Sequence, residues 1–257
     1  MSARYTAAEM MTVTASRALT NGQSCFVGIG LPSEAANLAR LTHAPEVVLI
    51  YESGTLETKP DVLPLSIGDG ELCETALITV SVPEMFRYWV QGGRIDVGFL
   101  GAAQIDKFAN LNTTLIGDYR APKVRLPGGG GAPEMATCTG EIFITLKHSK
   151  RTFVDTVDFV TTVGFGRDGK ARENVPNIGA GPTRVITDLC VMQPDADTNE
   201  LTVASLHPGV SREEVIEATG WQIAFADELA TTAEPGDEEL TVLRQLKERT
   251  AQHHDAS

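Results

Sequence analysis

The sequence has few of the features that mark metalloproteins, membrane proteins and secreted proteins. Its four cysteines, Cys25, Cys73, Cys138 and Cys190, stand far apart, and none belongs to a C-x-x-C pair or a Cys/His cluster. A zinc site is therefore not expected, and isolated thiols are typical of a reducing compartment. No apolar run approaches the roughly 20 residues that span a bilayer, and the opening MSARYTAAEMM lacks a signal-peptide core. We expect a cytoplasmic protein that uses no metal.

Positive charge is also scarce in this chain. Lys and Arg number 21 against 34 Asp and Glu, which gives a formal net charge of −13. Such a surface repels phosphate backbones and anionic lipids, so nucleic-acid binding and membrane binding are not expected. An anionic small substrate remains compatible with this charge where cations are placed locally.

The chain does contain a regular alternation of apolar runs and helical patterns. Its 257 residues are 42% hydrophobic, with 24 glycines and 13 prolines, which suits a substantial core and many tight turns. The expected strands are 24–28, 46–51, 95–101, 141–147, 155–163, 184–192 and 201–206. The pattern predicts the α/β class, with a mixed, partly parallel open sheet and flanking helices. We expect a single domain over residues 1–257.

Capping residues mark where the helices begin and end. A helix over 6–20 should end at Asn21-Gly22, and Ser33 is a plausible N-cap for the next one. Two capping boxes precede further helices, one at Ser81 and Glu84 and one at Ser211 and Glu214. Residues from about 236 to 257 should form a charged C-terminal helix followed by a polar tail, QHHDAS.

Glu52 is the most unusual carboxylate in the sequence. It follows the apolar run EVVLIY, so it lies at the carboxyl end of an expected buried strand, where α/β sheets keep their sites. Ser53 and Gly54 are small and would let a ligand approach. A solvated loop glutamate with no function remains the alternative.

The first glycine turn, GIGLPS at residues 28–33, lies between an expected strand and a helix. It resembles half of a dinucleotide-binding fingerprint, but the third glycine of that pattern is replaced by Ser33. A tight βα turn is therefore favoured over a nucleotide site. The turn around Gly28 and Gly30 would still present backbone N–H groups that can hold an anion.

A second glycine segment, PGGGGAP at residues 127–133, gives up much chain entropy when it is ordered. Either the backbone must approach a ligand closely, or the segment is a flexible surface loop. Arg120, Lys123 and Arg125 lie just upstream and could recognise an anion, although a solvated face is the commoner outcome for such a run.

Taken together, four motifs of this chain resemble the β subunit of family I coenzyme A transferases. They occur in the family's order over about residues 8–245, and they read VGIGLPSEAANL, YESG, GGRIDVGFLGAAQIDKFANLN and GDYRAPKVRLPGGGGAPEMA. The resemblance implies the fold of that subunit and a CoA-transferase activity that needs no cofactor besides its CoA thioester substrate.

The resemblance also implies roles for individual residues. Glu52, in the E-x-G motif, would attack the donor thioester and carry CoA as a glutamyl thioester, in covalent catalysis with ping-pong kinetics. Gly131, with Gly130 beside it, would stabilise the oxyanion, and Gly28 to Gly30 would line the same carbonyl. Anion recognition by the three upstream cations stays a hypothesis.

Departures from the family's pattern refine this interpretation. Many relatives read S-E-N-G where this chain has Y-E-S-G, and Ser53 points to the branch acting on glutaconate and 3-oxoadipate. Succinyl-CoA with 3-oxoadipate is the expected substrate pair, ahead of acetyl-CoA with glutaconate.

Two other departures concern the backbone and the partner. Ala109 replaces a glycine of the family's pattern, which argues against a positive φ at this residue. The family's G-x-G-G-F loop is absent, so an α subunit is expected as partner, in an α2β2 heterotetramer.

Three other functions remain as alternatives at this point. A CoA-thioester or ring-opening hydrolase on the same scaffold is disfavoured by Glu52. A dinucleotide-binding module is disfavoured by the broken glycine fingerprint. A non-catalytic subunit that completes another chain's site would retain activity without Glu52. His148 and His207 are expected to be structural rather than ligands.

Overall fold

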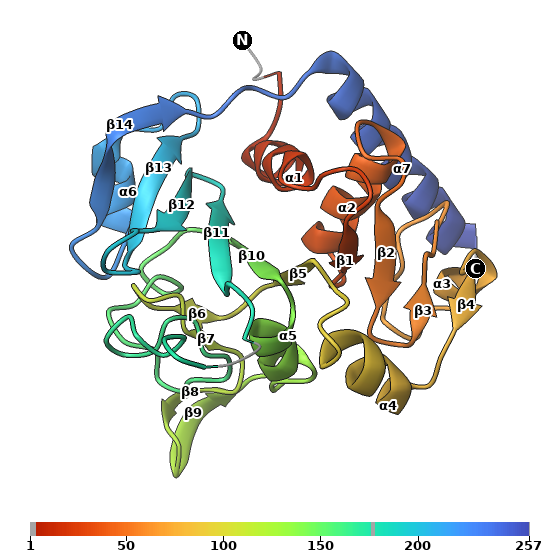
Figure 1. Ribbon diagram of the computed structural model, residues 1–257. Helices are drawn as coiled ribbons and strands as arrows, with labels where there is room; N and C mark the ends of the chain where they lie inside the picture. The colour runs from red at the N-terminus through yellow and green to blue at the C-terminus, as the bar shows by residue number, and fades with distance from the viewer. Residues whose placement is uncertain (1–3, 176–177, 257) are drawn as a thin grey trace. The chain divides into compact units, whose positions relative to one another are not determined.

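The computed structural model describes residues 4–175 and 178–256, and Figure 1 shows the course of the chain. The chain divides into two compact units. Unit 1 comprises Met1–Phe99 and Glu234–Ser257, and unit 2 comprises Leu100–Ala233. Each unit is built on its own set of strands, and each is described separately below. The expectation of a single domain stays a prediction.

Unit 1 is organised around a mixed sheet in the order β5-β1-β2-β3-β4. Its strands are β1 (Ser24–Phe26), β2 (Val48–Tyr51), β3 (Thr55–Leu56), β4 (Ile78–Thr79) and β5 (Val97–Leu100). The central β1 pairs in parallel with β2 and β5. Strand β3 pairs antiparallel with β2, and β4 pairs antiparallel with β3. The parallel strands are almost entirely apolar, as expected for strands covered on both faces.

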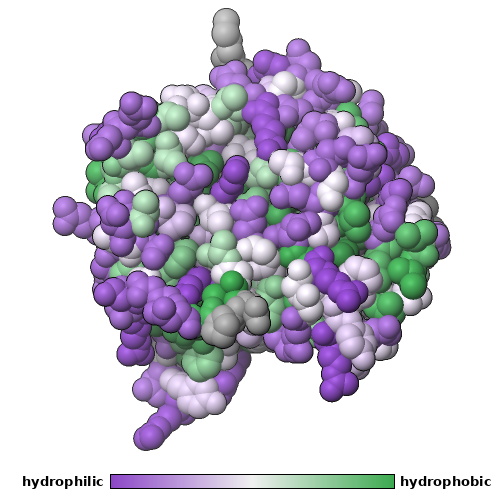
Figure 2. Space-filling model, viewed as in Figure 1, coloured by the Kyte–Doolittle hydropathy of each residue, from purple (hydrophilic) through white to green (hydrophobic). Residues whose placement is uncertain are grey.

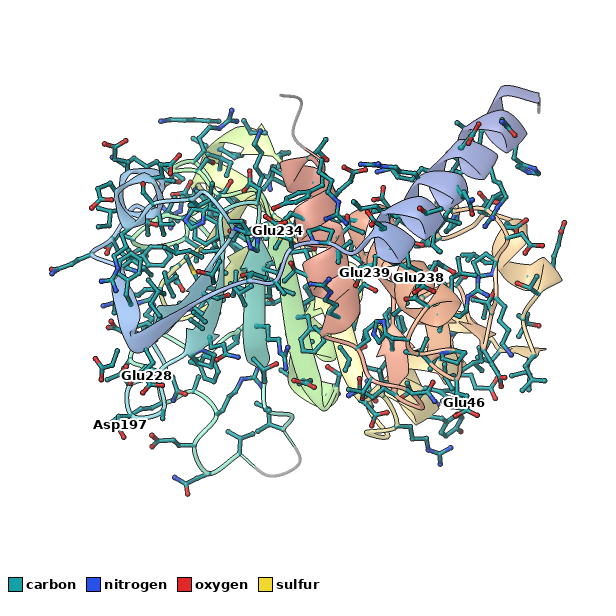
Figure 3. The ribbon with its side chains drawn as sticks, turned by 90° about the horizontal axis from the view of Figure 1, so that it is seen from above. Glu46, Asp197, Glu228, Glu234, Glu238 and Glu239 are labelled. Atoms are coloured by element: carbon teal, nitrogen blue, oxygen red, sulfur yellow. The ribbon has the colours of Figure 1, made fainter. Side chains whose placement is uncertain are left out.

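Three long helices belong to unit 1. They are α1 (Ala7–Arg17), α2 (Leu31–Leu41) and α7 (Asp237–Ala256). Val13, Leu38 and Leu243, one from each helix, form a buried apolar cluster. Thr6 and Glu9 close a capping box at the start of α1. Figure 3 shows the acidic first turn of α7, with Glu238 and Glu239, which favours the helix N-terminus.

The remaining helical segments of unit 1 are short. They are α3 (Glu71–Glu74), α4 (Val82–Glu84) and the π-helix η1 (Met85–Val90) that continues α4. The Ser81 hydroxyl accepts the backbone N–H of Glu84 and so caps α4. The wider π turn buries Met85 and Val90. The predicted helix is present here, but its π-helical geometry has no signal in the sequence.

Unit 2 contains five neighbouring sheet strands in the order β14-β13-β12-β11-β10. They are β10 (Glu141–Leu146), β11 (Pro182–Thr187), β12 (Cys190–Pro194), β13 (Leu201–Leu206) and β14 (Ala224–Thr231). Two small hairpins accompany them, formed by β6 (Gln104–Ile105) with β7 (Leu111–Asn112) and by β8 (Leu115–Asp118) with β9 (Ala121–Arg125). The helices are α5 (Ala132–Cys138) and α6 (Arg212–Ala218).

Several expectations about individual elements were wrong. Residues 155–163 form no strand, and residues 184–192 are two strands that turn at Asp188 and Leu189. The segment QHHDAS was expected as a polar tail, but α7 continues through it to Ala256. Helix α2 begins at Leu31 with Gly30 as its N-cap, because Ser33 turns its hydroxyl toward a neighbouring strand instead. The capping box at Ser211 and Glu214 is confirmed.

Candidate active site

Glu52 lies in the tight hairpin loop that joins β2 to β3. Tyr51 and Thr55 are paired across the hairpin, so residues 52–54 form the loop. The Gly54 N–H donates to the Tyr51 carbonyl at 3.0 Å, which closes the turn around Glu52. The glutamate is half-buried. The structure thus places it at the carboxyl end of a buried strand, as the sequence predicted.

Gly54 is required by the geometry of this turn. Its φ is +103°, and a Cβ built there would lie 2.0 Å from the Val80 carbonyl oxygen. The Gly54 carbonyl in turn accepts the Val80 N–H at 2.8 Å. No side chain fits at such a close backbone approach, so the glycine of the Y-E-S-G motif has a structural explanation.

The Gly28–Gly30 turn lies at the same edge of the sheet as Glu52. Strands β1 and β2 are parallel, with Phe26 opposite Ile50, and the Val27 N–H donates to the Ile50 carbonyl at 2.8 Å. The carboxyl ends of both strands therefore meet at one edge, the usual location of sites in α/β proteins. Gly30 has a φ of +84° and is the N-cap residue of α2.

The described residues contain three buried side-chain polar atoms without a hydrogen-bond partner, and two of them flank Gly54. They are the Ser53 Oγ and the Thr55 Oγ1, and the third is the His207 Nδ1. Unpaired buried hydroxyls are unfavourable, and they concentrate where a protein meets a ligand or partner. Their position beside Glu52 marks the hairpin as a candidate functional site.

The second glycine segment lies in unit 2, immediately before α5. Gly128 and Gly130 have φ values of +104° and +49°, which explains why glycine occurs at both positions. Thr113 fixes Gly128, since the Gly128 N–H donates to the Thr113 carbonyl and the Thr113 hydroxyl donates to the Gly128 carbonyl, each at 2.8 Å. Gly131 is the N-cap residue of α5 and is buried. The segment is therefore ordered rather than a free surface loop.

The three candidate cations lie on the β8–β9 hairpin of unit 2. Arg120 is in its turn, while Lys123 and Arg125 are on β9, and all three are exposed. Tyr119 in the turn stacks on Phe159 with ring centroids 5.7 Å apart. The structure brings these cations together on one hairpin, as expected for local anion recognition, but exposure alone leaves that role a hypothesis.

Two buried histidines belong to the interior of unit 2. The ring of His148 contacts the Thr219 Oγ1 at 3.0 Å and stacks on Phe153, and burial lowers its pKa to about 4. His207 contacts the Thr187 carbonyl at 2.8 Å through Nε2, and burial lowers its pKa as well. Their predicted structural role agrees with these contacts.

Ala109 departs from the expectation that a residue with a Cβ would avoid a positive φ. Its φ is +56°, and it is fully buried. The Cα of Gly164 packs directly against the Phe108 and Ala109 backbone, so that a Cβ on Gly164 would lie 2.3 Å from the Phe108 carbonyl oxygen. Buried Asn110 next door bonds the Asp106 carboxylate, the Gly166 carbonyl and the Gly164 N–H. This packing holds Ala109 in a conformation that it would not choose alone.

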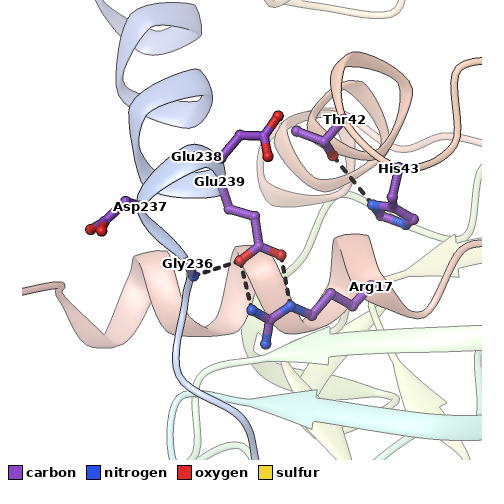
Figure 4. A pocket seen from close by; sticks show the side chains of 7 residues that line it. All are labelled: Arg17, Thr42, His43, Gly236, Asp237, Glu238 and Glu239. Atoms are coloured by element: carbon purple, nitrogen blue, oxygen red, sulfur yellow. Dashed lines mark hydrogen bonds and ion pairs between the residues drawn. The ribbon is translucent and has the colours of Figure 1, made fainter.

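A pocket of about 450 Å³ in unit 1 lies away from the predicted site residues (Figure 4). Arg17 and Glu239 occupy it as a bidentate ion pair, with distances of 2.7 and 2.6 Å, while Thr42 contacts the His43 ring. Because the charge of the arginine is already paired with a carboxylate, the pocket is poorly suited to an anionic substrate. The ion pair stabilises the junction of α1 and α7 instead.

Several exposed hydrophobic side chains of unit 1 come from the loop before α3 and from the start of β4 with the residue before it. They are Leu65, Ile67, Leu77 and Ile78, of which Leu77 is 74% exposed. Figure 2 shows hydrophobic surface at the edge of the view where Figure 1 places α3, β3 and β4. Among the described residues, no group of three or more His, Cys, Asp or Glu side chains is arranged to hold a metal ion. Likewise, none of the described helices has both the length and the apolar character needed to cross a bilayer.

Comparison with known proteins decides the family. A sequence model described as coenzyme A transferase matches residues 8–218. The chain belongs to the coenzyme A transferase family. It is 63% identical over 250 residues to the B subunit of the 3-oxoadipate CoA-transferase of Pseudomonas knackmussii, with 97% of this chain and 96% of the relative covered. The predicted membership and the predicted enzyme class, a CoA-transferase, are thereby confirmed.

Two further relatives are similar to this chain over most of their length. The B subunit of the glutaconate CoA-transferase of Acidaminococcus fermentans is 37% identical, with 85% and 84% of the two chains covered. The crystal structure of that glutaconate transferase superposes with a TM-score of 0.87 over 94% of each chain, at 31% identity, which confirms the predicted fold class. The IpdB subunit of a cholesterol ring-cleaving hydrolase from Rhodococcus jostii is 31% identical, with 84% and 81% covered.

Sequence reasoning missed several residues that shape the site. The hydroxyl of Tyr51 and the side chains of Ser33 and Asn37 form a hydrogen-bonded cluster beneath the Glu52 turn. Val80 anchors Gly54 from 26 residues away, and no local signal indicates such a contact. The tyrosine could have been found, because a phenol in a buried strand requires a polar partner.

Proposed function

We propose that this chain is the B-type subunit of a transferase that moves CoA from succinyl-CoA to 3-oxoadipate through Glu52. The observation that carries the proposal is the position of this carboxylate in a fixed hairpin turn, in which the next residue and Thr55 carry unpaired buried hydroxyls. The high identity to a 3-oxoadipate transferase subunit supports the choice of acceptor.

The proposed reaction begins with acylation of the carboxylate. A Glu52 oxygen attacks the thioester carbonyl of succinyl-CoA, the C–S bond breaks, and CoA leaves as a thiolate. The thiolate then attacks the glutamyl carbonyl of the mixed anhydride and releases succinate. The product of this half-reaction is a glutamyl-CoA thioester on Glu52.

The second half-reaction runs the same chemistry in reverse with the acceptor. A carboxylate oxygen of 3-oxoadipate attacks the glutamyl thioester and displaces the CoA thiolate. The thiolate attacks the 3-oxoadipyl carbonyl of the new anhydride, which forms 3-oxoadipyl-CoA and restores the Glu52 carboxylate. The cycle consumes no oxidant or metal, because each step exchanges one acyl partner for another.

Each step passes through a tetrahedral oxyanion that backbone N–H groups stabilise. One well-placed donor is worth about 3–4 kcal/mol in comparable enzymes. In this proposal Gly131, with Gly130 beside it, contributes to the oxyanion site, and the Gly28–Gly30 turn lines the reacting carbonyl. Recognition of the CoA or acid anion by Arg120, Lys123 and Arg125 is a further part of the proposal.

We also infer that activity requires an α-type partner subunit, in an α2β2 assembly. The relatives of this chain are named as B subunits, which supports a paired enzyme. The test is to mix the purified chain with its candidate α subunit, to measure the molecular mass of the complex, and to assay the CoA-transferase activity of the same sample. Transferase activity of the isolated chain would contradict this requirement.

Borohydride trapping tests the central step. The assembled enzyme is mixed with succinyl-CoA, treated with borohydride and digested, and the peptide YESGTLETKP (51–60) is examined for a reduced glutamate. We expect reduction at Glu52, with loss of activity. Glu57 lies in the same peptide and pairs with Lys59 at 3.3 Å, which makes Glu57→Gln a matched control that should stay active and labelled.

Two outcomes would point to the alternatives. Full activity of Glu52→Ala in the assembled enzyme would make the chain a non-catalytic partner of another subunit. Release of free CoA from succinyl-CoA without an acceptor acid would favour a CoA-thioester hydrolase on the same fold. Comparison of kcat/KM for 3-oxoadipate and glutaconate decides between the two expected acceptors.

A further inference from the structure

A fully buried tyrosine precedes Glu52 in the chain. Tyr51 is the last residue of β2, and it has no exposed surface although it carries a phenol. Its hydroxyl lies 2.8 Å from the Ser33 Oγ, and the Asn37 Nδ2 donates to it at 3.4 Å. Both partners belong to the first two turns of α2. The phenol therefore connects the end of β2 to the helix that follows the Gly28–Gly30 turn.

The hydrogen-bonded cluster extends further along α2, and its side chains make additional hydrogen bonds. The Asn37 Nδ2 also donates to the Ser33 carbonyl at 3.0 Å, and the Arg40 Nη2 donates to the Asn37 Oδ1 at 3.2 Å. The same Arg40 nitrogen donates to the Pro60 carbonyl at 2.8 Å. A buried polar network with its members paired specifies one arrangement, because each alternative leaves a donor or acceptor unsatisfied.

The backbone on either side of Glu52 is fixed by different contacts. Before it, the Tyr51 side chain is held by α2. After it, Gly54 is held by its bonds to the Tyr51 carbonyl and the Val80 N–H. Burial raises the pKa of Tyr51 to about 12, so the phenol remains a neutral hydrogen-bonding group at working pH. The glutamate thus lies between two anchors, and the first combines the strand pairing of Tyr51 with Thr55 and the contact of a single hydroxyl with α2.

We propose that Tyr51 is a positioning residue for the reaction at Glu52. Its hydroxyl, held by Ser33 and Asn37, sets where the hairpin begins and hence where the carboxylate meets the thioester carbonyl. Nucleophilic attack needs reacting atoms about 3–3.5 Å apart, and a displacement of about 1 Å can cost a factor of 100 in rate. This inference rests on the proposed role of Glu52.

The test removes the phenol oxygen while keeping the ring. In the assembled enzyme, Tyr51→Phe is mixed with succinyl-CoA, and the rate of borohydride-trappable label at Glu52 is followed in a single turnover. We expect labelling to be about tenfold slower, with the KM for succinyl-CoA changed less than about twofold, because the Tyr51 hydroxyl is fully buried and is not exposed for a direct contact with CoA. Ser33→Ala should reproduce the slower rate, and the double variant should be no slower than either single one.

Thr42→Val serves as the matched control. It removes a hydroxyl that donates to the Leu38 carbonyl at 2.6 Å, at the opposite end of the same helix. We expect it to lower the melting temperature without slowing the labelling of Glu52. If both Tyr51→Phe and Ser33→Ala label as fast as Thr42→Val, the positioning role is wrong. If the wild-type enzyme itself acquires no label at Glu52, the proposed function fails, and that outcome is distinct from the first.

Discussion

The Glu52 hairpin and the polyglycine segment at residues 127–133 require glycine for different reasons. In unit 1, Gly54 is needed because a backbone oxygen, that of Val80, occupies the space where a side chain would start. In unit 2, Gly128 and Gly130 are needed because of their positive φ angles, and a Cβ on Gly128 would meet nothing within 4 Å. A steric contact therefore excludes a side chain at Gly54 in addition to its positive φ, whereas at Gly128 only the φ angle disfavours one. Substitutions should therefore affect the two loops to different degrees.

The largest effect is expected for Gly54→Ala. A methyl group would overlap the Val80 oxygen, and the residue would also remain in a strained conformation, which alone costs about 1–3 kcal/mol. We expect loss of transferase activity together with a fall in unfolding free energy above that range, measured by denaturant unfolding of the chain. A variant of normal stability and activity would show that the hairpin can relax, and the contrast with the other loop would disappear.

A fall in pH should destabilise unit 2 before it destabilises unit 1. In unit 2, the pKa of His148 is lowered by burial to about 4, and that of His207 is lowered too. Because these values lie below those of the unfolded chain, the histidines stabilise the fold above pH 6.5 and lose that contribution as the pH falls. We expect unit 2 to lose up to about 2 kcal/mol between pH 7 and pH 5.

Hydrogen exchange of peptides from each unit measures this difference. In unit 1, carboxylates with lowered pKa values, such as Glu9 at about 2, titrate only at lower pH. Peptides of unit 2 should therefore lose protection first, and His148→Gln should reduce the pH dependence. If peptides of both units lose protection from hydrogen exchange at the same pH, the proposed difference in their acid stability is wrong.

A smaller effect is expected within the polyglycine segment. Gly130→Ala places a side chain at a φ of +49°, which costs about 1–2 kcal/mol. Gly129 has no positive φ, and its Cβ would lie 3.2 Å from the Thr161 Cγ2, so Gly129→Ala should change stability by less than about 1 kcal/mol. Thermal unfolding of both variants checks the order, and a more damaging Gly129→Ala would show that contact also governs this loop.

The smallest structural effect is expected for the charged hairpin. Replacing Arg120, Lys123 and Arg125 together by alanine should change stability by less than about 0.5 kcal/mol, because all three are exposed. If they recognise an anion, the KM for succinyl-CoA should rise about threefold at low salt, with kcat unchanged. An unchanged KM would leave them as a solvated face.

Much of the fold could be predicted because its signals are local. The strands over 24–26, 48–51 and 141–146 follow from short apolar runs between turn residues, and the capping box at Ser211 and Glu214 from three-residue spacing. Glu52 was found for the same reason, since the end of an apolar run fixes its place at the edge of the sheet. The family resemblance then supplied its expected chemical role.

The parts that could not be predicted depend on contacts between distant residues. Residues 155–163 alternate like a strand, but tertiary packing leaves them irregular, with one isolated bridge between Leu111 and Thr162. Ser33 has the local features of an N-cap, yet the buried phenol of Tyr51 competes for its hydroxyl. The π-helix and the left-handed Ala109 likewise result from packing that a propensity scale does not contain.

The contact between Gly54 and Val80 links the turn around Glu52 to the register of β4. Residues 57–77 leave the hairpin, pass through α3 and return as β4, whose last neighbour is the residue that holds Gly54. A shift of β4 by one residue against β3 would move Val80 away from Gly54 and release the turn. The register of a strand far along the chain from the acid therefore forms part of the definition of the site, and a comparison of related sequences should test that register as strictly as residue identity.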